Sequence, residues 1–182
     1  MNAKKYLKTA AYELICEKPI EKLNTKAIFE RAEVSRQTFY RLYRDKYAIA
    51  NEIYDELFQT DIIDPKAVNS NQDWREMYFR QFSAYRKHLD FVRHLFSSRE
   101  TGCTLDHEID LVMAFDRDYI RKKGGNVDDP RIQFAIEAKD VGGTWAMRDW
   151  ILGGMQVSDE EMAERFALVI PKILLPYYTD EI

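Results

Sequence analysis

The 182-residue sequence is poor in cysteine and has no long apolar run, and each shortage excludes a class of protein. Cys16 and Cys103 cannot form the framework of a disulfide-rich secreted domain or a zinc site, so we expect two free thiols in a reducing compartment. No segment approaches the roughly 18 consecutive apolar residues that span a membrane. Glu13 and Glu17 interrupt the apolar pattern near the N-terminus, which argues against a signal peptide. We therefore expect a cytoplasmic protein without a membrane anchor.

Catalytic and metal-binding patterns are also missing. The sequence contains no nucleophile motif, phosphate-binding loop or zinc signature. Asp106, His107 and Glu108 are consecutive, so on a helix they cannot all face one metal ion. We predict no enzymatic activity, no cofactor and no metal. A helical enzyme built around an aromatic cavity is an alternative that no acid–base or metal constellation supports.

The residues that are present indicate a folded protein with an uneven charge. Hydrophobic residues make up 46% of the chain and aromatic residues 13%, which is enough for a sizeable core rich in rings. Residues 1–50 contain 11 Lys/Arg and 6 Asp/Glu, a net charge of +5, whereas the remaining residues carry −9. A basic end on an acidic body suits a protein that binds a polyanion at that end only.

Apolar residues recur at helical spacing along the whole chain, so we predict an all-α protein. Leu7, Ala10, Ala11, Leu14 and Ile15 form the stripe of a first helix that ends before Pro19. Ser158, followed by Glu161, caps the last helix, whose stripe continues to Tyr177 with a bend at Pro171. The other helices are expected at about 25–32, 35–43, 46–62, 74–89, 91–96, 105–123 and 131–152.

The predicted helix at 35–43 has two different faces. Arg36, Gln37, Tyr40, Arg41 and Arg44 lie on one arc, which is basic and rich in hydrogen-bonding groups, while Ser35, Phe39, Leu42 and Tyr43 lie on the opposite, packing arc. We expect Leu14, Ile28, Val34, Phe39 and Tyr43 to form a small core under the first three helices. The helix before it and the turn at Ala32–Ser35 complete a helix-turn-helix, a unit that places its second helix in the major groove of DNA.

Residues 25–46, TKAIFERAEVSRQTFYRLYRDK, resemble the signature of the TetR-type regulators, T-x-x-I-A-x-x-A-G-V-S-x-x-T-[FL]-Y-x-[HY]-F-x-x-K. The sequence matches this pattern at Thr25, Ile28, Ala32, Val34, Ser35, Thr38, Phe39, Tyr40 and Lys46. It departs at Phe29, Glu33, Leu42 and Tyr43. Glu33 replaces a turn glycine, at a position where a positive φ is easier for glycine.

The resemblance implies a homodimer with an N-terminal three-helix helix-turn-helix domain, residues 1–47, and a C-terminal helical bundle, residues 48–182, for dimerisation and ligand binding. Arg36, Gln37 and Lys26 are the candidate base contacts, since Arg and Gln pair with guanine and adenine by two hydrogen bonds. The candidate contacts to the DNA backbone are Thr25, Ser35, Thr38, Tyr40, Arg41 and Lys46.

The C-terminal part is expected to hold a ligand and a dimer interface. The candidate residues of a pocket for a small apolar or aromatic inducer are Phe79, Phe82, Tyr85, Phe96, Phe115, Tyr119 and Trp145, although rings at helical spacing are commonly core. The candidate residues of the dimer interface are Gly142, Gly143, Trp150, Phe166, Ile170 and Leu174. Intramolecular packing is the alternative role of the second set.

The function that follows is a DNA-binding transcriptional regulator, a repressor that a small molecule releases from a palindromic operator. The alternative is a TetR-like co-regulator that acts through protein–protein contacts without binding an operator. A steep salt dependence of DNA affinity would distinguish the first from the second.

Overall fold

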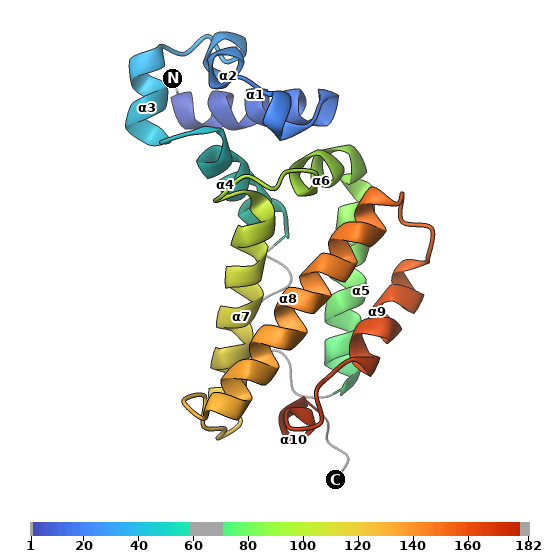
Figure 1. The fold of residues 1–182 in the computed structure, drawn as a ribbon. Coiled ribbons are helices and arrows are strands. Elements are labelled where there is room, and N and C mark those ends of the chain that lie inside the picture. The colour runs from blue at the N-terminus through green and yellow to red at the C-terminus, as the bar shows by residue number, and fades with distance from the viewer. Residues whose placement is uncertain (1, 59–70, 179–182) are drawn as a thin grey trace. The chain divides into compact units, whose positions relative to one another are not determined.

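The protein, seen here as a computed structural model, is helical throughout (Figure 1). The structure describes residues 2–58 and 71–178, and these contain no β-strand. The helices are α1 (Ala3–Glu17), the short 3-10 helix η1 (Ile20–Lys22), α2 (Thr25–Arg31), α3 (Arg36–Leu42), α4 (Lys46–Phe58), α5 (Asn71–Lys87), α6 (Leu89–Phe96), α7 (Thr104–Lys122), α8 (Pro130–Leu152), α9 (Asp159–Leu168) and α10 (Leu175–Tyr178). The prediction of an all-α protein is confirmed.

The chain folds into two compact units. Unit 1 comprises Met1–Gln59 and His88–His107, and unit 2 comprises Thr60–Lys87 and Glu108–Ile182. Helix α6 and the first turn of α7 therefore belong with the N-terminal helices. The boundary expected near residue 48 lies within α4, and the division of roles between the two parts of the chain stays a prediction.

Unit 1 is organised around α1, which packs against α2, α3, α4 and α6. The stripe predicted on this helix is buried, and so is the small core expected around Phe39. Leu42 differs from the prediction, because its side chain is 38% exposed although it was expected to pack. It occupies the last position of α3, where the helix ends and the chain turns away in an extended conformation at Tyr43.

The turn between α2 and α3 has a strained backbone. Glu33 adopts a φ of 53°, as its position in the glycine-like turn predicts. The amide of Val34 donates to the carbonyl of Phe29 and that of Glu33 to the carbonyl of Glu30, so the end of α2 holds this conformation in place. A residue with a Cβ atom is disfavoured at such a φ by about 1–2 kcal/mol.

We expect Glu33→Gly to raise the free energy of unfolding by about 0.5–1 kcal/mol, since the strain removed exceeds the entropy that a glycine loses on folding. Urea denaturation of the two proteins measures the difference. Glu33→Ala is the matched control, because it removes the carboxylate and keeps the Cβ atom. Equal stability of the glycine and alanine variants would contradict this explanation.

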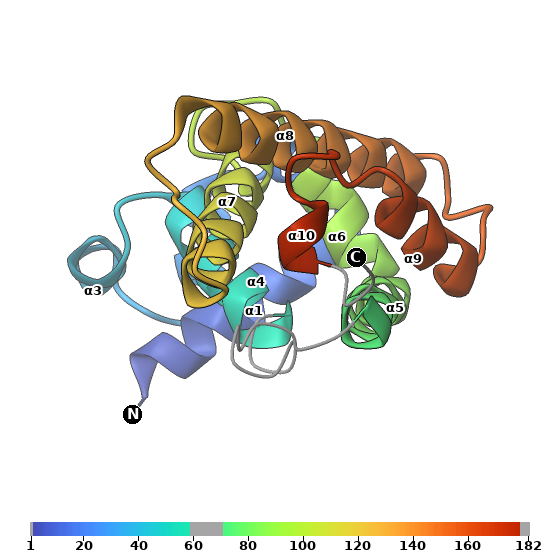
Figure 2. The same ribbon diagram turned by 90° about the horizontal axis from the view of Figure 1, so that it is seen from below.

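Unit 2 is a bundle in which α5 packs against α9, and α7 and α8 run along it (Figures 1 and 2). The short α10 closes one end of the bundle, with Tyr178 stacked on Trp74 of α5 at 4.7 Å between ring centroids. Leu174, Ile120 and Ile136 lie in the same core and are fully buried. Most of the interior of this unit is therefore aromatic and aliphatic packing.

The C-terminal helix is shorter than predicted. The Ser158 hydroxyl accepts a hydrogen bond from the amide of Glu161, so the expected cap is present. Helix α9 nevertheless ends at Leu168, and the chain turns before α10 begins at Leu175. Pro171 has no amide hydrogen to donate and its ring crowds the preceding turn, so it separates two helices where a bend was expected.

Candidate DNA-binding face and internal cavity

The second helix of the helix-turn-helix, α3, is held by a cap at its start and by buried residues beneath it. The Ser35 hydroxyl accepts a hydrogen bond from the Thr38 amide at 3.1 Å and lies 3.0 Å from the Thr38 hydroxyl. Phe39 is fully buried and contacts the rings of Phe29 and Tyr43. Phe29, which replaces a small residue of the TetR signature, is therefore part of the packing under α3.

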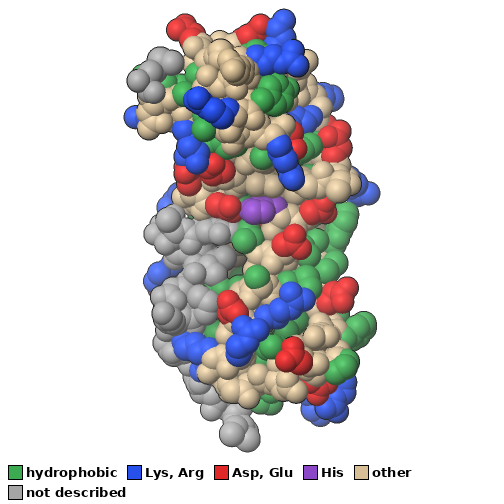
Figure 3. Space-filling model, turned by 90° about the vertical axis from the view of Figure 1, so that its left-hand side faces the viewer, with side chains coloured by type: hydrophobic (Ala, Val, Ile, Leu, Met, Phe, Trp, Pro, Cys, Tyr) green, Lys and Arg blue, Asp and Glu red, His purple; other side chains and the backbone are tan. Residues whose placement is uncertain are grey.

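The outward face of α3 carries the predicted contacts. Arg36, Gln37, Tyr40 and Arg41 are exposed, and the Arg36 guanidinium lies over the Tyr40 ring at 5.6 Å. Figure 3, which looks towards the α3 side, shows Lys and Arg side chains distributed over the surface of unit 1. Arg36 and Gln37 can each form two hydrogen bonds to one base, and the Tyr40 hydroxyl and the neighbouring basic groups can contact phosphates.

The remaining predicted contacts lie at the starts of α2 and α4. Asn24 caps α2, because its side-chain oxygen accepts a hydrogen bond from the Lys26 amide at 2.8 Å. The Lys26 side chain is exposed, and its ammonium lies 3.5 Å from a carboxylate oxygen of Glu30. Thr25 and Lys46 line one surface depression. The Lys46 ammonium donates to the carbonyl of Glu21 at 3.0 Å, a contact that the sequence did not indicate. All nine predicted positions thus belong to unit 1, on α2, α3 and the segments that begin α3 and α4.

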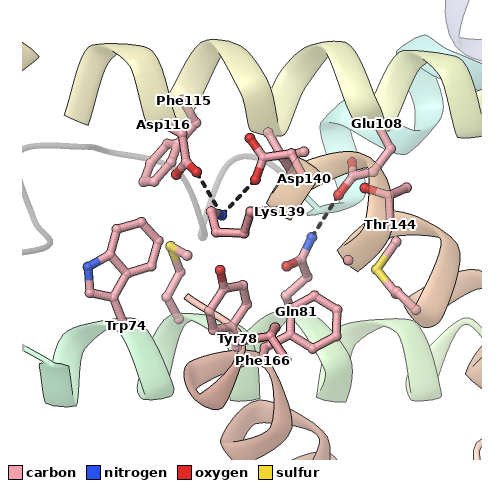
Figure 4. Close-up of a pocket in the computed structure, with 15 residues that line it drawn as sticks. Trp74, Tyr78, Gln81, Glu108, Phe115, Asp116, Lys139, Asp140, Thr144 and Phe166 are labelled. Atoms are coloured by element: carbon pink, nitrogen blue, oxygen red, sulfur yellow. Dashed lines mark hydrogen bonds and ion pairs between the residues drawn. The ribbon is translucent and has the colours of Figure 1, made fainter. Parts of the chain in front are cut away.

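Unit 2 contains a partly open cavity of about 50 Å³. The described residues that line it come mainly from α5, α7, α8 and α9 (Figure 4), and they are Trp74, Met77, Tyr78, Gln81, Glu108, Val112, Phe115, Asp116, Lys139, Asp140, Gly143, Thr144, Met147, Phe166 and Val169. The cavity holds only a few water-sized molecules in this conformation.

Buried charges occupy one wall of the cavity. The Lys139 ammonium lies 2.6 Å from a carboxylate oxygen of Asp116 and 2.6 Å from one of Asp140, as Figure 4 shows. All three side chains are less than a tenth exposed. Gln81 donates to Glu108 at 3.2 Å and to the Tyr85 hydroxyl at 2.8 Å. The cavity is thus apolar over most of its wall and strongly polar at these two places.

The ionisation of Lys139 and Asp140 reflects their burial. Burial lowers the pKa of Lys139, but the charge of Asp116, followed by those of Tyr78 and Asp140, outweighs it and holds this pKa well above its ordinary value. Burial raises the pKa of Asp140 to about 7, against the opposing effect of Lys139. At neutral pH, therefore, Lys139 is charged while Asp140 is divided between its neutral and charged forms.

This pKa predicts a pH dependence of stability. The folded-state pKa of Asp140 lies above the ordinary value of 3.8, so the folded protein binds more protons than the unfolded chain between about pH 4 and pH 7. The stability that the protonated carboxyl contributes is complete below pH 4 and is lost as the pH rises to about 7. The loss is about 1.4 kcal/mol per pH unit at most.

The Asp140→Asn variant has no ionisable group at this position, so its free energy of unfolding should lack this pH dependence. We therefore expect the variant to become more stable relative to the natural protein as the pH rises from 5 to 8. Thermal unfolding of both proteins across that range is the measurement. A difference between the two proteins that does not vary with pH would refute the assignment to Asp140.

The cavity differs from the predicted aromatic pocket. Of the seven predicted residues, Phe115 alone lines it. Phe82, Tyr85 and Tyr119 are buried in the packing, Phe96 lies in unit 1, and Phe79 is 37% exposed. Trp145, the seventh, is half-buried beneath the guanidinium of Arg148. The sequence analysis did not predict the polar lining of the cavity. The sequence does contain an indication of it, because Glu108 and Asp116 lie at four-residue spacing with the apolar residues Val112 and Ile120 on one face of α7.

The residues predicted for the dimer interface lie in different environments. Gly142 is exposed, whereas a Cβ atom on Gly143 would lie 3.3 Å from the Phe166 ring. Leu174 is fully buried within unit 2, and the Trp150 indole donates to the carbonyl of Val157 at 3.1 Å. Phe166 and Ile170 are half-buried. Phe134, Leu168 and Val169, which the sequence analysis did not select, are 72%, 81% and 60% exposed.

The histidines have partners within unit 1. His94 donates to the carbonyl of Ile15 at 2.6 Å, His88 is hydrogen-bonded to the Tyr12 hydroxyl, and His107 lies 2.7 Å from the Asp55 carboxylate. Within residues 2–58 and 71–178, no three His, Cys, Asp or Glu side chains are grouped to hold a metal ion. In the same parts of the chain, no helix is long and apolar enough to cross a membrane.

Both parts of the chain match known protein families. Residues 7–53 match the family described as "Bacterial regulatory proteins, tetR family", and residues 72–172 match "Transcriptional regulator C-terminal region". No curated protein matches the sequence.

The solved structures that resemble the fold include the following two. The dihydroxyacetone kinase operon activator DhaS is 14% identical, with a TM-score of 0.60 over 98% of this chain and 99% of that one. RolR, solved without ligand, is 12% identical, with a TM-score of 0.58 over 91% of this chain and 89% of that one. The matches to both parts of the chain, together with the capped and exposed α3, lead to one conclusion: the chain belongs to the TetR family of transcriptional regulators and carries a helix-turn-helix DNA-binding domain.

Proposed function

We propose that the protein is a homodimeric repressor that binds a palindromic operator and is released from it by a small molecule bound in unit 2. The observation that carries the proposal is the exposed face of α3, on which Arg36, Gln37, Tyr40 and Arg41 stand clear of the core. We assign base contacts to Arg36, Gln37 and Lys26, and backbone contacts to Thr25, Ser35, Thr38, Tyr40, Arg41 and Lys46. We assign no catalytic activity to the chain and expect it in the cytoplasm.

DNA affinity at two salt concentrations tests this proposal against the co-regulator alternative. Arg41 and Lys46 are the basic residues assigned to the DNA backbone, so a dimer makes four cationic phosphate contacts, which correspond to a loss of about 10² in affinity between 50 and 200 mM salt. Fluorescence anisotropy with a labelled duplex measures this loss. Absence of DNA binding at 50 mM salt, in a sample that is folded, would favour a co-regulator that acts through protein contacts.

We place the dimer interface on the outer face of α8 and the end of α9. Phe134, Ala138, Gly142 and Ala146 follow one another at four-residue spacing and are all exposed. The last three also line a groove of about 590 Å³ between α8 and α9. Small residues allow two helices to approach closely, and large exposed apolar side chains beside them favour a second copy as the partner.

The dimer has its own test. We expect light scattering at micromolar concentration to give a mass near twice 21.6 kDa for the natural protein. Phe134→Glu is expected to shift the mass towards that of the monomer, because it buries a charge in the interface. Tyr6→Glu, which alters another exposed ring, on α1, is the control and is expected to stay dimeric. A monomeric natural protein would overturn this part of the proposal.

Helix α7 supports a route from ligand to DNA. Its middle turns carry Glu108 and Asp116, which line the cavity, and its first turn belongs to unit 1. In this first turn, the Thr104 hydroxyl donates to the side-chain oxygen of Asn51 at 2.8 Å, and His107 contacts the carboxylate of Asp55. Asn51 and Asp55 both belong to α4. We infer that a ligand which shifts α7 alters α4 and the separation of the two α3 helices, which must match one turn of DNA.

Repression is the proposed direction of control. Activation is the alternative, since DhaS, which shares the fold, is described as an operon activator. A promoter fusion measured with and without this protein distinguishes the two directions. Reporter output that rises when the protein is removed supports repression, and output that falls identifies an activator.

A further inference from the structure

More acidic than basic side chains line the cavity in unit 2. Three carboxylates, Glu108, Asp116 and Asp140, line it, and Lys139 is the single cation among the described residues of its wall. The ammonium of Lys139 is already shared between Asp116 and Asp140 at 2.6 Å from each. The cavity therefore has no cation left over for an anionic ligand, and an anion there would face buried like charge.

Two carboxylate oxygens in this wall make no hydrogen bond with the described residues, Oδ2 of Asp116 and Oδ2 of Asp140, and the first of them is ion-paired with Lys139. The Oδ2 atom of Asp140 is buried and makes no hydrogen bond within the part of the chain that the structure describes. The side chain of Asp140 is 2% exposed, so bulk water does not solvate it. A buried acceptor without a donor costs free energy, more so when it is charged, and an N–H group brought to this position would recover that cost.

The rest of the wall suits an organic body attached to such a group. Tyr78, Phe115 and Phe166 present rings to the same cavity, and Figure 4 shows the Tyr78 side chain pointing towards Lys139 and the acidic pair. Aromatic faces attract cations as well as apolar groups. Met77 and Met147 also line the cavity, and their flexible thioether side chains allow it to widen for a small ligand.

We propose that the ligand of this cavity is a small organic cation: a protonated amine on a body of about one ring, with its N–H groups directed at Asp140. This inference rests on the proposed function of unit 2 as the ligand-binding part, and it narrows that function to one chemical class. Asp140 accepts from the amine, the rings enclose the apolar body, and Lys139 remains with Asp116.

A matched series of ligands tests the charge requirement on the natural protein. Benzylamine, benzyl alcohol and benzoate have similar bodies and are cationic, neutral and anionic at pH 7.5. We expect calorimetry to show benzylamine binding at least tenfold more tightly than benzyl alcohol, with no measurable binding of benzoate. Equal or tighter binding of the alcohol or of benzoate would overturn the proposal, and so would the absence of benzylamine binding at millimolar concentration.

Two variants locate the site. Asp140→Asn is expected to lower the affinity for benzylamine at least tenfold and to leave that for benzyl alcohol within about threefold, because it removes the charge and keeps the shape. Asp149→Asn alters an exposed carboxylate on the same helix and is the control, with unchanged affinity expected. Unchanged benzylamine binding by a folded Asp140→Asn would contradict the site.

The same ligands separate this inference from the proposed function. If benzyl alcohol or benzoate binds in place of the amine and lowers the affinity for DNA, the ligand-controlled regulator stands and the cationic class is wrong. If benzylamine binds through Asp140 but leaves DNA binding unchanged, the cationic site stands and its role in release is wrong.

Discussion

Lys139→Met is expected to lower the free energy of unfolding by about 3–5 kcal/mol, because removing one partner of a buried ion pair leaves uncompensated charge. In this protein the variant would leave Asp116 and Asp140 facing each other in a cavity wall where both are at most 3% exposed. Methionine keeps most of the volume of the lysine stem, so a cavity would contribute little to the loss. Urea denaturation at pH 8 measures the effect.

The stability lost in Lys139→Met is expected to depend on pH. Protonation of Asp140 relieves the repulsion between the two carboxylates, so the destabilisation is expected to be smaller at pH 5 than at pH 8. Lys172→Met changes an exposed lysine of unit 2 and is expected to alter stability by no more than about 0.5 kcal/mol. An equally small effect of Lys139→Met at pH 8 would show that Lys139, Asp116 and Asp140 do not form an ion-paired unit.

Arg36→Ala is expected to weaken binding to the specific operator by roughly 2–6 kcal/mol. A bidentate contact to guanine contributes about 1–3 kcal/mol of discrimination, and a dimer loses two of them. Binding to unrelated duplexes should fall far less, since the other basic groups remain. Electrophoretic or anisotropy titrations against the operator and a scrambled duplex measure both affinities.

Two further substitutions separate the reading of bases from contact with phosphates. Arg36→Lys keeps the positive charge and loses the planar fork, so it should lose discrimination between sequences and retain non-specific affinity. Tyr40→Phe removes a hydroxyl assigned to the DNA backbone and should weaken both duplexes by a similar factor. Arg93→Ala, on α6 of the same unit and exposed, is the control. If Arg36→Ala keeps full operator affinity and specificity, the assigned contact is wrong.

The helix-turn-helix could be predicted closely from sequence because local signals determine it. Asn24 and Ser35 cap α2 and α3, and the buried residues Ile28 and Phe39 recur in helical register. The positive φ of Glu33 followed from its place in the turn. These features depend on residues near one another in the chain, so a short pattern contains most of the information that specifies them.

The cavity could not be predicted in the same way, because residues far apart in sequence form it. Aromatic residues at helical spacing suggested a pocket, yet Phe82 and Tyr119 pack into the core and Phe115 alone reaches the cavity. Helical periodicity identifies the buried side of a helix but does not tell which buried residues border a space. Charged residues within the apolar stripes, such as Asp116 and Lys139, were the more informative signal, since charge is seldom buried without a partner.

Selection of binding sites from a random pool of duplex DNA, with the purified protein at two salt concentrations, tests the central claim most directly. The account predicts enrichment of an inverted repeat whose half-sites are centred about 34–36 Å apart, or one turn of DNA, and more stringent enrichment at the higher salt. Failure of a folded, dimeric sample to enrich any sequence would contradict direct operator binding and support a co-regulator that acts through protein contacts.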